Sequence, residues 1–166
     1  MSSSCSVYYS SPIGLLRISA TGTCISEVHF CKSIDEQREE DPDNPPEVLM
    51  QCREELIAYF QGRRKAFDVP VQQEGTAFQQ LVWGELLNIP YGKTISYLTL
   101  SKRLGDPKSI RAAASTNGKN KIAIIVPCHR VIGSNNDLVG YGGGIWRKKA
   151  LLELEAKYTY GVQTLF

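Results

Sequence analysis

A cysteine and a histidine stand next to each other in the segment Val126-Pro127-Cys128-His129-Arg130-Val131. A free thiol has a pKa of about 8.5, so a cysteine that acts as a nucleophile at neutral pH needs a base or a positive charge close by. His129 can provide the base and Arg130 the charge. Because adjacent residues do not naturally face each other, we expect His129 to act on Cys128 through a bridging water. The pair favours nucleophilic chemistry at Cys128, although an inert buried cysteine beside a surface histidine would give the same pattern.

A histidine that acts as a base needs a hydrogen-bond acceptor on its other ring nitrogen. Glu155 lies among leucines in a helix predicted over residues 146–157. A carboxylate at an otherwise apolar helical position must find a partner, which makes Glu155 the candidate that orients His129. The apolar run at residues 122–126 is too short for a core helix, so we predict a buried extended segment that leads to Cys128.

The elements in the first half of the chain are predicted from its hydrophobic pattern. Residues 6–30 alternate with a period of two and predict a small antiparallel meander. The alternating sets are Leu16, Ile18 and Ala20 on one face, and Ser26, Val28 and Phe30 on another. The acidic, proline-rich residues 35–46 predict an exposed loop. A helix should follow, with Asn44 as its cap and Pro46 in its first turn, and then a short strand over residues 67–71.

The second half of the chain is predicted to be mostly helical. Thr76 begins a helix whose pattern ends at residues 88–92. Ser96 is a plausible cap for a short helix that runs to residue 104, and Asp106-Pro107 starts another that ends at Gly118. Two short helices joined by a tight turn are typical of a helix-turn-helix that binds DNA, although ordinary helical hairpins share the pattern.

Length, charge and cysteine content limit the class of protein. The chain has 166 residues and a globular composition, which excludes collagen-like, coiled-coil and low-complexity proteins. Residues 1–75 carry 7 Lys and Arg against 12 Asp and Glu, whereas residues 76–166 carry 12 against 5, so we expect only the second half to face a polyanion. The five scattered cysteines predict reduced thiols. No signal or membrane segment is apparent, and we expect a cytoplasmic protein, or a nuclear one in a eukaryote.

The segment around Cys128, preceded by Ile124-Ile125-Val126, resembles the active-site signature of the O6-alkylguanine-DNA alkyltransferases, the methylated-DNA protein-cysteine methyltransferases. The resemblance covers residues 76–158, with a weaker match at residues 11–16. Further motifs that fall in the family's order are Phe78-Gln79-Gln80-Leu81-Val82-Trp83, residues 89–97, Arg111-Ala112-Ala113, Gly118-Lys119-Asn120 and residues 140–144. The implied fold class is α/β, with a small ribonuclease H-like sheet-plus-helix domain at 1–74 and a mostly α, winged-helix-like DNA-binding domain at 75–166.

The resemblance implies a direct reversal of DNA alkylation. Cys128 would attack the alkyl carbon on guanine O6 and keep the group as a thioether, so each molecule would act once, without a cofactor. His129 and Glu155 match the family's base and its orienting carboxylate. Tyr97 matches the tyrosine that donates to the base, and Asn120 the side chain that braces the active-site turn. Repair of O4-alkylthymine is left open.

The expected partner is double-stranded DNA that contains O6-alkylguanine, bound by a monomer through the minor groove and without a membrane. The target base lies inside the duplex, so it must be flipped out. By resemblance, Arg111 enters the stack from the minor groove, and the small Ala112 and Ala113 allow close approach of their helix. We assign Ser96 and Lys108 to the same DNA-binding set.

The resemblance also implies a substrate pocket. It assigns Val131, Tyr141, Gly142 and Gly143 to this pocket, with the carbonyls of Cys128 and Val131 as acceptors for the guanine amino group. The Gly142 N–H would point at the base and Tyr141 would pack beside it. Gly142 stands where some family members carry a serine, and the smaller glycine would widen the pocket toward bulkier alkyl groups.

Some members of the family also bind zinc in the N-terminal half. The candidate ligands here are Cys5, Cys24, His29 and Cys31. Alternation along a strand would place Cys24 and His29 on opposite faces, so we expect no metal.

Two other functions remain open at this stage. A relative that recognises lesions without repairing them would lack the cysteine, which is present here. A Cys-His hydrolase would use Cys128 and His129 too, but it would need an oxyanion hole and would release its product repeatedly.

Overall fold

The computed structural model describes residues 4–32 and 41–161. The chain divides into two compact units, residues 1–73 and residues 74–166, which are described separately below. Within the described residues, no helix is long and apolar enough to cross a bilayer.

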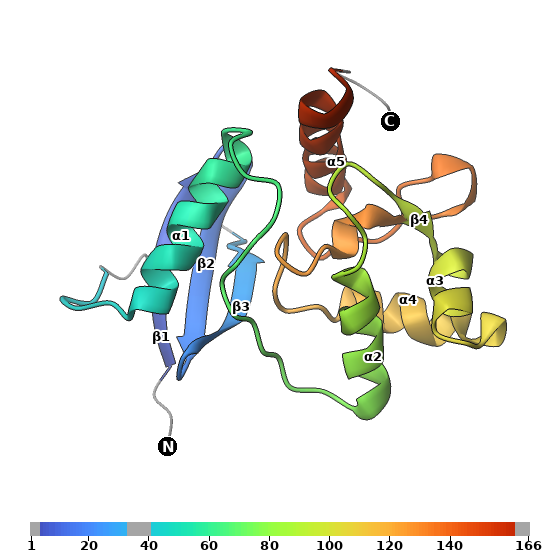
Figure 1. Ribbon diagram of the computed structural model, residues 1–166, viewed down its shortest axis with the longest axis horizontal. Coiled ribbons are helices and arrows are strands. Elements are labelled where there is room, and N and C mark those ends of the chain that lie inside the picture. Colours follow the sequence, from blue (N-terminus) through green and yellow to red (C-terminus); the bar gives the residue numbers. More distant parts are fainter. Residues whose placement is uncertain (1–3, 33–40, 162–166) are drawn as a thin grey trace. The chain divides into compact units, whose positions relative to one another are not determined.

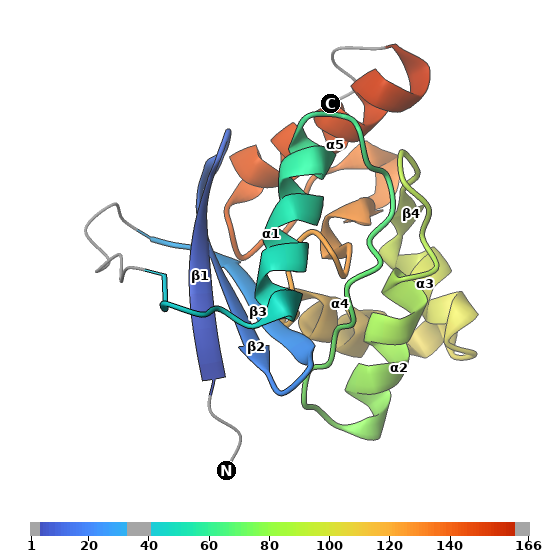
Figure 2. The ribbon, with the colours of Figure 1, turned by 60° about the vertical axis from the view of Figure 1, so that its left-hand side comes forward.

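The N-terminal unit is an antiparallel meander with one helix, as predicted. Its strands β1 (Ser4–Ser11), β2 (Gly14–Thr21) and β3 (Cys24–Phe30) pair in sequence order, and helix α1 (Glu47–Phe60) packs across the sheet, as Figures 1 and 2 show. Leu16 lies opposite Phe30, and Ile18 opposite Val28. Cross-strand partners share a face, so Val28 and Phe30 lie on the same face of the sheet as Leu16 and Ile18 rather than on another.

A β-bulge changes the alternation in β3. Ser19 pairs with Glu27 but Ala20 pairs with Ile25, so β3 contains one residue more than β2 at this point. Cys24 and His29 therefore lie opposite Thr21 and Arg17, on the same face of the sheet, and their predicted placement on opposite faces is wrong. The described residues contain no cluster of three or more metal-ligating side chains.

Two local predictions in this unit are also wrong. Helix α1 begins at Glu47 with Pro46 as its N-cap, and no side chain caps it, so Asn44 lies outside the helix. The segment 67–71 is not a strand, because it makes a single bridge, between Val71 and Ile25. The backbone N–H groups of residues 68 and 69 donate instead to the Glu55 carboxylate. Residues 35–40 of the predicted acidic loop lie outside the described residues.

The C-terminal unit begins with helix α2 (Ala77–Leu86), whose start is set by a capping box. The Thr76 hydroxyl accepts from the Gln79 backbone N–H at 3.1 Å, and the Thr76 N–H donates to the Gln79 side chain at 2.9 Å. Trp83 is buried and donates to the Thr116 carbonyl at 3.2 Å. Leu81, which belongs to the motif at residues 78–83, is exposed on the same helix.

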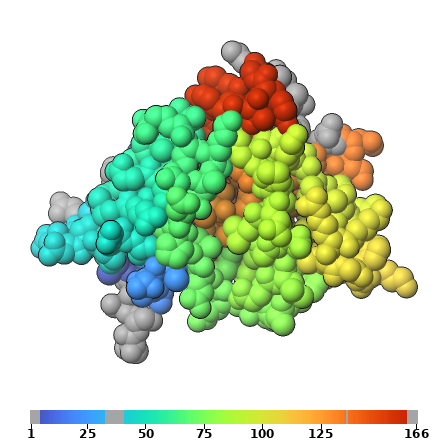
Figure 3. Space-filling model, viewed as in Figure 1, coloured from blue at the N-terminus to red at the C-terminus, as the bar shows by residue number. Residues whose placement is uncertain are grey.

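The predicted helix-turn-helix is present in this unit. Helix α3 (Tyr97–Arg103) is followed by the short 3-10 helix η1 (Pro107–Ser109) and by α4 (Ile110–Gly118), and α3 packs against α4. Ser96 caps α3 by accepting from the Thr99 N–H at 3.0 Å, and Asp106 accepts from the Lys108 N–H at 2.9 Å. Figure 3 shows this segment, in yellow, on the surface of the unit.

The remaining elements of the C-terminal unit surround the sequence motif at Cys128. Strand β4 (Ile95–Ser96) pairs in parallel with β5 (Val131–Ile132). Two 3-10 helices flank β5, η2 (Cys128–Arg130) before it and η3 (Ser134–Asn136) after it. Helix α5 (Ile145–Tyr160) ends the described chain and is longer than the predicted helix.

Candidate active site

A tight turn delivers Cys128 to the site. The segment 122–126 is buried apart from the half-buried Ala123, but it folds back on itself instead of running extended, with Ile124 in the left-handed region at φ 71°. The Asn120 carboxamide holds both ends of this turn. Its Nδ2 donates to the carbonyls of Ile122 at 3.2 Å and Val126 at 2.8 Å, and its Oδ1 accepts from the Ile122 N–H at 3.1 Å. The extended conformation predicted from the apolar run is therefore wrong.

Replacement of Asn120 with Ala should destabilise this turn. The change removes three hydrogen bonds worth about 1 kcal/mol each and frees a β-branched residue, Ile124, held at positive φ. We expect the free energy of unfolding, measured by urea denaturation, to fall by about 3 kcal/mol. The control is Asn88→Ala, at an exposed position after α2. Equal losses in the two variants would contradict a bracing role for Asn120.

His129 and Glu155 form a buried pair beside Cys128. The His129 side chain is fully buried, and its Nε2 lies 2.7 Å from Glu155 Oε2. Because a carboxylate accepts, Nε2 carries the proton and Nδ1 the lone pair. Burial lowers the pKa of His129 even though Glu155 opposes the shift. The imidazole is therefore neutral at pH 7 and able to take a proton. Within the described chain, Nδ1 is buried and has no hydrogen-bond partner.

Arg130 binds Glu155 rather than serving Cys128. Its Nε donates to Glu155 Oε1 at 2.8 Å, its Nη2 to Oε2 at 3.1 Å, and its Nη1 to the Ile89 carbonyl at 2.7 Å. The Gly92 N–H also donates to Glu155, at 3.1 Å. Burial alone would raise the pKa of Glu155, but His129 and Arg130 outweigh it and hold the pKa well below its usual range. The carboxylate is charged, and it fixes the orientation of the imidazole.

Cys128 is 7% exposed, and burial raises the pKa of its thiol. The Asn120 side chain and the Lys148 ammonium oppose this shift without overcoming it. The resting cysteine is therefore a thiol at neutral pH. The simple expectation of a thiolate stabilised by Arg130 is wrong, because that guanidinium is turned to Glu155. A thiolate forms here only when a base removes the proton.

Two tyrosines border the site as phenols. Tyr97 is the first residue of α3, and its hydroxyl donates to the Val139 carbonyl at 3.3 Å. Burial raises the pKa of Tyr97 and raises that of Tyr141 well above its usual value. The Tyr141 hydroxyl is buried and has no hydrogen-bond partner within the described chain. Both groups keep their protons at neutral pH and can donate hydrogen bonds.

The predicted pocket residues surround the Cys128 backbone and the loop before α5. Val131 is fully buried, and its N–H donates to the Cys128 carbonyl. Gly142 and Gly143 form the turn before α5, where a Cβ at Gly142 would meet no atom within 4 Å. Space therefore does not require glycine at position 142, and a serine would fit there.

The resemblance assigns the Cys128 and Val131 carbonyls as acceptors for the guanine amino group. In the structure two side chains already donate to these carbonyls, and sequence reasoning missed both. Asn117 Nδ2 donates to the Cys128 carbonyl at 3.3 Å, and Lys148 Nζ donates to the Val131 carbonyl at 2.7 Å. A carbonyl oxygen has two lone pairs, so each can accept a second hydrogen bond. Asn117 and Lys148 are polar residues on the buried sides of α4 and α5, and a buried polar side chain must find a partner. A search for apolar residues alone overlooks this signal.

The predicted DNA-binding residues do not all reach one surface. Arg111, Ala112 and Lys108 are exposed on the helix-turn-helix. Ala113 is fully buried on the inner side of α4, so its side chain does not reach the surface. Ser96 is half-buried, and its hydroxyl is engaged in capping α3. The structure thus leaves Arg111 as the exposed long side chain at the start of α4.

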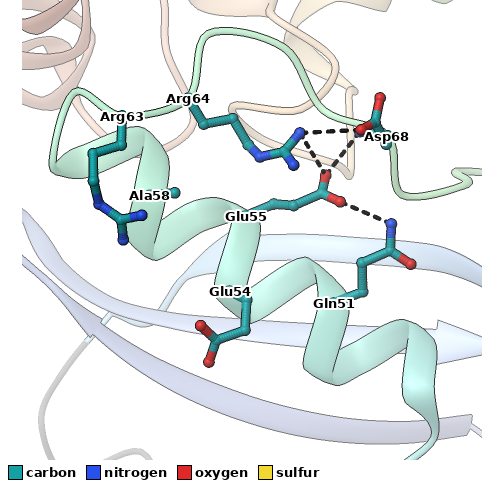
Figure 4. Close-up of a pocket in the computed structure, with 7 residues that line it drawn as sticks. All are labelled: Gln51, Glu54, Glu55, Ala58, Arg63, Arg64 and Asp68. Atoms are coloured by element: carbon teal, nitrogen blue, oxygen red, sulfur yellow. Dashed lines mark hydrogen bonds and ion pairs between the residues drawn. The ribbon is translucent and has the colours of Figure 1, made fainter.

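A separate hollow of about 480 Å³ lies on the N-terminal unit (Figure 4). It is lined by Gln51, Glu54, Glu55, Ala58, Arg63, Arg64 and Asp68, none of which belongs to the predicted site. Glu55 accepts from Gln51 Nε2 at 2.8 Å and from the backbone N–H groups of Asp68 at 2.8 Å and Val69 at 3.2 Å. The Glu55 carboxylate therefore accepts hydrogen bonds from backbone N–H groups that a strand over residues 67–71 would use to pair with a neighbouring strand.

Comparison with known proteins defines the class. A family model described as "6-O-methylguanine DNA methyltransferase, DNA binding domain" matches residues 77–157, and one described as the ribonuclease-like domain of the same family matches residues 6–73. A Mycobacterium bovis protein named methylated-DNA–protein-cysteine methyltransferase is 44% identical over 156 residues, which are 94% of each chain. A Methanosarcina acetivorans protein of the same name is 43% identical over 89% of this chain and 95% of its own.

Solved structures agree with these matches. The crystal structure of Mycobacterium tuberculosis O6-methylguanine methyltransferase has a TM-score of 0.82 and 42% identity, and the alignment covers 96% of this chain and 97% of that one. A structure of the M. tuberculosis protein in complex with DNA has a TM-score of 0.82 and 43% identity over 92% of this chain and 93% of its own. The chain belongs to the 6-O-methylguanine DNA methyltransferase family. The predicted family and fold class are confirmed.

Proposed function

We propose that this protein repairs DNA by moving the alkyl group of O6-alkylguanine to Cys128, once per molecule. The observation that carries the proposal is the buried His129–Glu155 pair at 2.7 Å, next to a cysteine of the family's signature. The relatives are named for transfer from methylated DNA to a protein cysteine, and the DNA-bound structure of a 43% identical relative supports DNA as the partner.

The transfer begins with removal of the Cys128 proton. His129 is neutral and can accept it at Nδ1 through one water, while Glu155 stabilises the resulting imidazolium. The thiolate attacks the alkyl carbon, a new C–S bond forms, and the C–O6 bond breaks with its electron pair passing to guanine. The departing guanine takes up a proton, for which Tyr97 is the predicted donor. The thioether does not hydrolyse, so Cys128 is consumed.

Access to the base requires that it leave the duplex. We propose that the helix-turn-helix binds the minor groove of double-stranded DNA as a monomer and that Arg111 fills the space left by the flipped base. Residues 75–166 would then form the domain that binds DNA and carries the chemistry, with residues 1–74 as a separate domain. Action on O4-alkylthymine and a cytoplasmic or nuclear location stay predictions.

Intact mass measurement tests this function. After incubation with duplex DNA containing O6-methylguanine, the protein should gain the mass of one methyl group, and the amount of DNA repaired should equal the amount of protein. Cys128→Ala should gain none and leave the lesion in place. Clearance of the lesion by Cys128→Ala would contradict the proposal. Repeated release of product from each molecule would instead indicate a Cys-His hydrolase.

A further inference from the structure

Trp146, in the first turn of α5, is 57% exposed. Tryptophan is among the most buried residues on average, because its ring is large and mostly apolar. The inward side of α5 carries Lys148, Leu151 and Glu155. Residue 146 lies two positions before Lys148, which is about 200° around the helix, so its side chain points away from the core of the unit. An exposed indole at this place indicates a contact surface.

The indole ring of Trp146 is held in place by its neighbours. The Arg147 guanidinium lies 4.5 Å from the centre of the ring, and its Nη1 donates to the Gly143 carbonyl at 3.0 Å. A Cβ at Gly144 would lie 3.2 Å from Cδ1 of the ring, so the backbone of the loop lies directly against the edge of the indole. Trp146 therefore presents a fixed aromatic surface with a cation on one face.

The loop that holds Trp146 also borders the nucleophile. The resemblance assigns residues 141–143 of this loop to the substrate pocket. Burial is the main reason that the pKa of Tyr141 lies well above its usual value, while Cys128 raises this pKa further and Arg147 lowers it. Because charges act on the Tyr141 hydroxyl at short range, this phenol is close both to Cys128 and to Arg147. Only one side chain thus separates the cysteine from the Trp146–Arg147 pair.

The same loop is attached to the helix-turn-helix. The Tyr97 hydroxyl of α3 donates to the Val139 carbonyl at 3.3 Å. The loop that leads from Val139 to α5 therefore begins beside the helix-turn-helix and ends at Trp146. A strand that binds the helix-turn-helix and places a flipped base at Cys128 passes close to this loop, so the surface at Trp146 continues the proposed DNA interface.

The charge around Trp146 suits a nucleic acid strand. Arg147 and the exposed Lys149 lie in the first two turns of α5, and the first turn contains no acidic residue. Lys149 makes only a 3.8 Å ion pair with Glu153. Proteins hold strands of nucleic acid with aromatic rings that pack on bases and with cations that face the phosphates. The pair of an open indole and a guanidinium offers both of these contacts.

We propose that Trp146 and Arg147 bind the DNA strand that carries the lesion, with the indole packed against the nucleotide next to the flipped base and the guanidinium facing the phosphate backbone. This inference rests on the proposed function for the identity of the flipped base. The contact with DNA can be measured without any transfer of an alkyl group.

Indole fluorescence tests the contact directly. The chain has two tryptophans, and the other, Trp83, is only 4% exposed. The titration uses Cys128→Ala, which leaves the lesion in place, and duplex DNA that contains O6-methylguanine. Packing against a nucleotide quenches an indole, so we expect DNA to quench the fluorescence, and the added change Trp146→Phe to remove most of this effect. The same DNA-dependent change in both proteins would assign the signal to Trp83 and overturn the inference.

Binding affinity gives a second test, with Tyr158→Ala as the matched control for Trp146→Ala. Tyr158 is also an exposed aromatic residue of α5 beside a cation, since Lys157 Nζ lies 5.3 Å from the centre of its ring. It lies 12 residues further along the chain, about 18 Å along the helix axis. We expect Trp146→Ala to lose about tenfold in affinity for the labelled duplex, measured by fluorescence anisotropy, and Tyr158→Ala to bind as the wild type does. Equal affinities of the two variants would contradict the inference. Circular dichroism establishes that each variant is folded.

The dependence of affinity on salt tests the role of Arg147. Arg147→Gln keeps a donor for the Gly143 carbonyl but removes the positive charge. Loss of one phosphate contact should reduce the slope of log affinity against log salt concentration by about one. An unchanged slope would refute a phosphate contact at this residue.

Transfer rates separate this inference from the proposed function. Trp146→Ala at limiting protein concentration should slow transfer from DNA about tenfold and leave transfer from free O6-benzylguanine unchanged. Equal losses on the two substrates would show that the ring serves the pocket rather than the strand, and would overturn the inference. If the wild-type protein gains no methyl group from DNA, the proposed function fails, while the fluorescence and affinity results still decide whether Trp146 binds DNA.

Discussion

Glu155→Gln should slow transfer to Cys128 by on the order of 10²-fold or more. A carboxylate holds the His129 ring in the tautomer with its lone pair on Nδ1 and stabilises the imidazolium that forms when the thiol gives up its proton. A neutral amide cannot stabilise the imidazolium as well as a carboxylate does, because it carries no negative charge. The rate is measured as single-turnover methyl transfer from duplex DNA at pH 7.4, with protein in excess.

The same substitution should lower the free energy of unfolding by about 3–5 kcal/mol, because it leaves the buried Arg130 guanidinium without its anion. The loss should depend on pH. The folded-state pKa of Glu155 lies below its unfolded value of about 4.3, so the carboxylate contributes its full stability above that pH and loses it as the pH falls further. The difference between wild type and variant should therefore shrink between pH 5 and pH 3.

Glu153→Gln is the matched control for both measurements. It makes the same chemical change two residues earlier in α5, at a half-buried side chain whose ion pair is a 3.8 Å contact with Lys149. We expect this variant to transfer at the wild-type rate and to lose less than about 1 kcal/mol. Similar behaviour of the two variants would show that the Glu155 network does not orient the base.

Arg111→Ala should reduce transfer from duplex DNA by roughly 10- to 100-fold while leaving transfer from free O6-benzylguanine nearly unchanged. Extrusion of a base costs a few kcal/mol in lost stacking, and a side chain that fills the gap offsets part of this cost. Each 1.4 kcal/mol of this stabilisation that is lost reduces the population of the flipped-out base tenfold. Arg111 suits this role because it is exposed at the start of α4 and its side chain makes no hydrogen bond or ion pair within the described residues.

Single-stranded DNA and a second arginine sharpen this experiment. A strand without a partner needs no extrusion from a duplex, so the effect of Arg111→Ala should be much smaller on single-stranded DNA carrying the same lesion. Arg103→Ala removes an exposed charge from the end of α3 and should weaken binding in a salt-dependent way without a preference for duplex substrate. Equal losses on duplex DNA and on the free base would rule out a flipping role for Arg111.

The helices of the C-terminal unit were predictable because their signals are local. Thr76 and Ser96 cap through atoms three residues away, and Asp106 through an atom two residues away, so the residue types alone define where these helices begin. The turn before Cys128 was not predictable in this way. An apolar run gives no sign that Asn120 will bind both ends of it, because that depends on where the chain returns.

The hydrogen-bond partners of the site residues could not be predicted, because they lie far away in the sequence. Arg130 meets a carboxylate 25 residues away, and Lys148 meets the Val131 carbonyl 17 residues away. Adjacency in sequence favoured Arg130 as the cation for Cys128, but in the fold the Arg130 guanidinium binds Glu155. In the N-terminal unit, Glu55 engages the amides of residues 68 and 69, an arrangement that strand propensity cannot indicate.

Helix α4 reaches both the outside of the unit and the nucleophile. Arg111 begins it at the surface, and Asn117, about 9 Å further along the axis, holds the Cys128 carbonyl. A helix this short is stiff, so a push on its outer end is transmitted to the inner one. If α4 binds DNA as proposed, a tilt of this helix on binding would be passed through the Asn117 side chain to the backbone of Cys128, so that recognition of DNA and placement of the sulfur would be coupled.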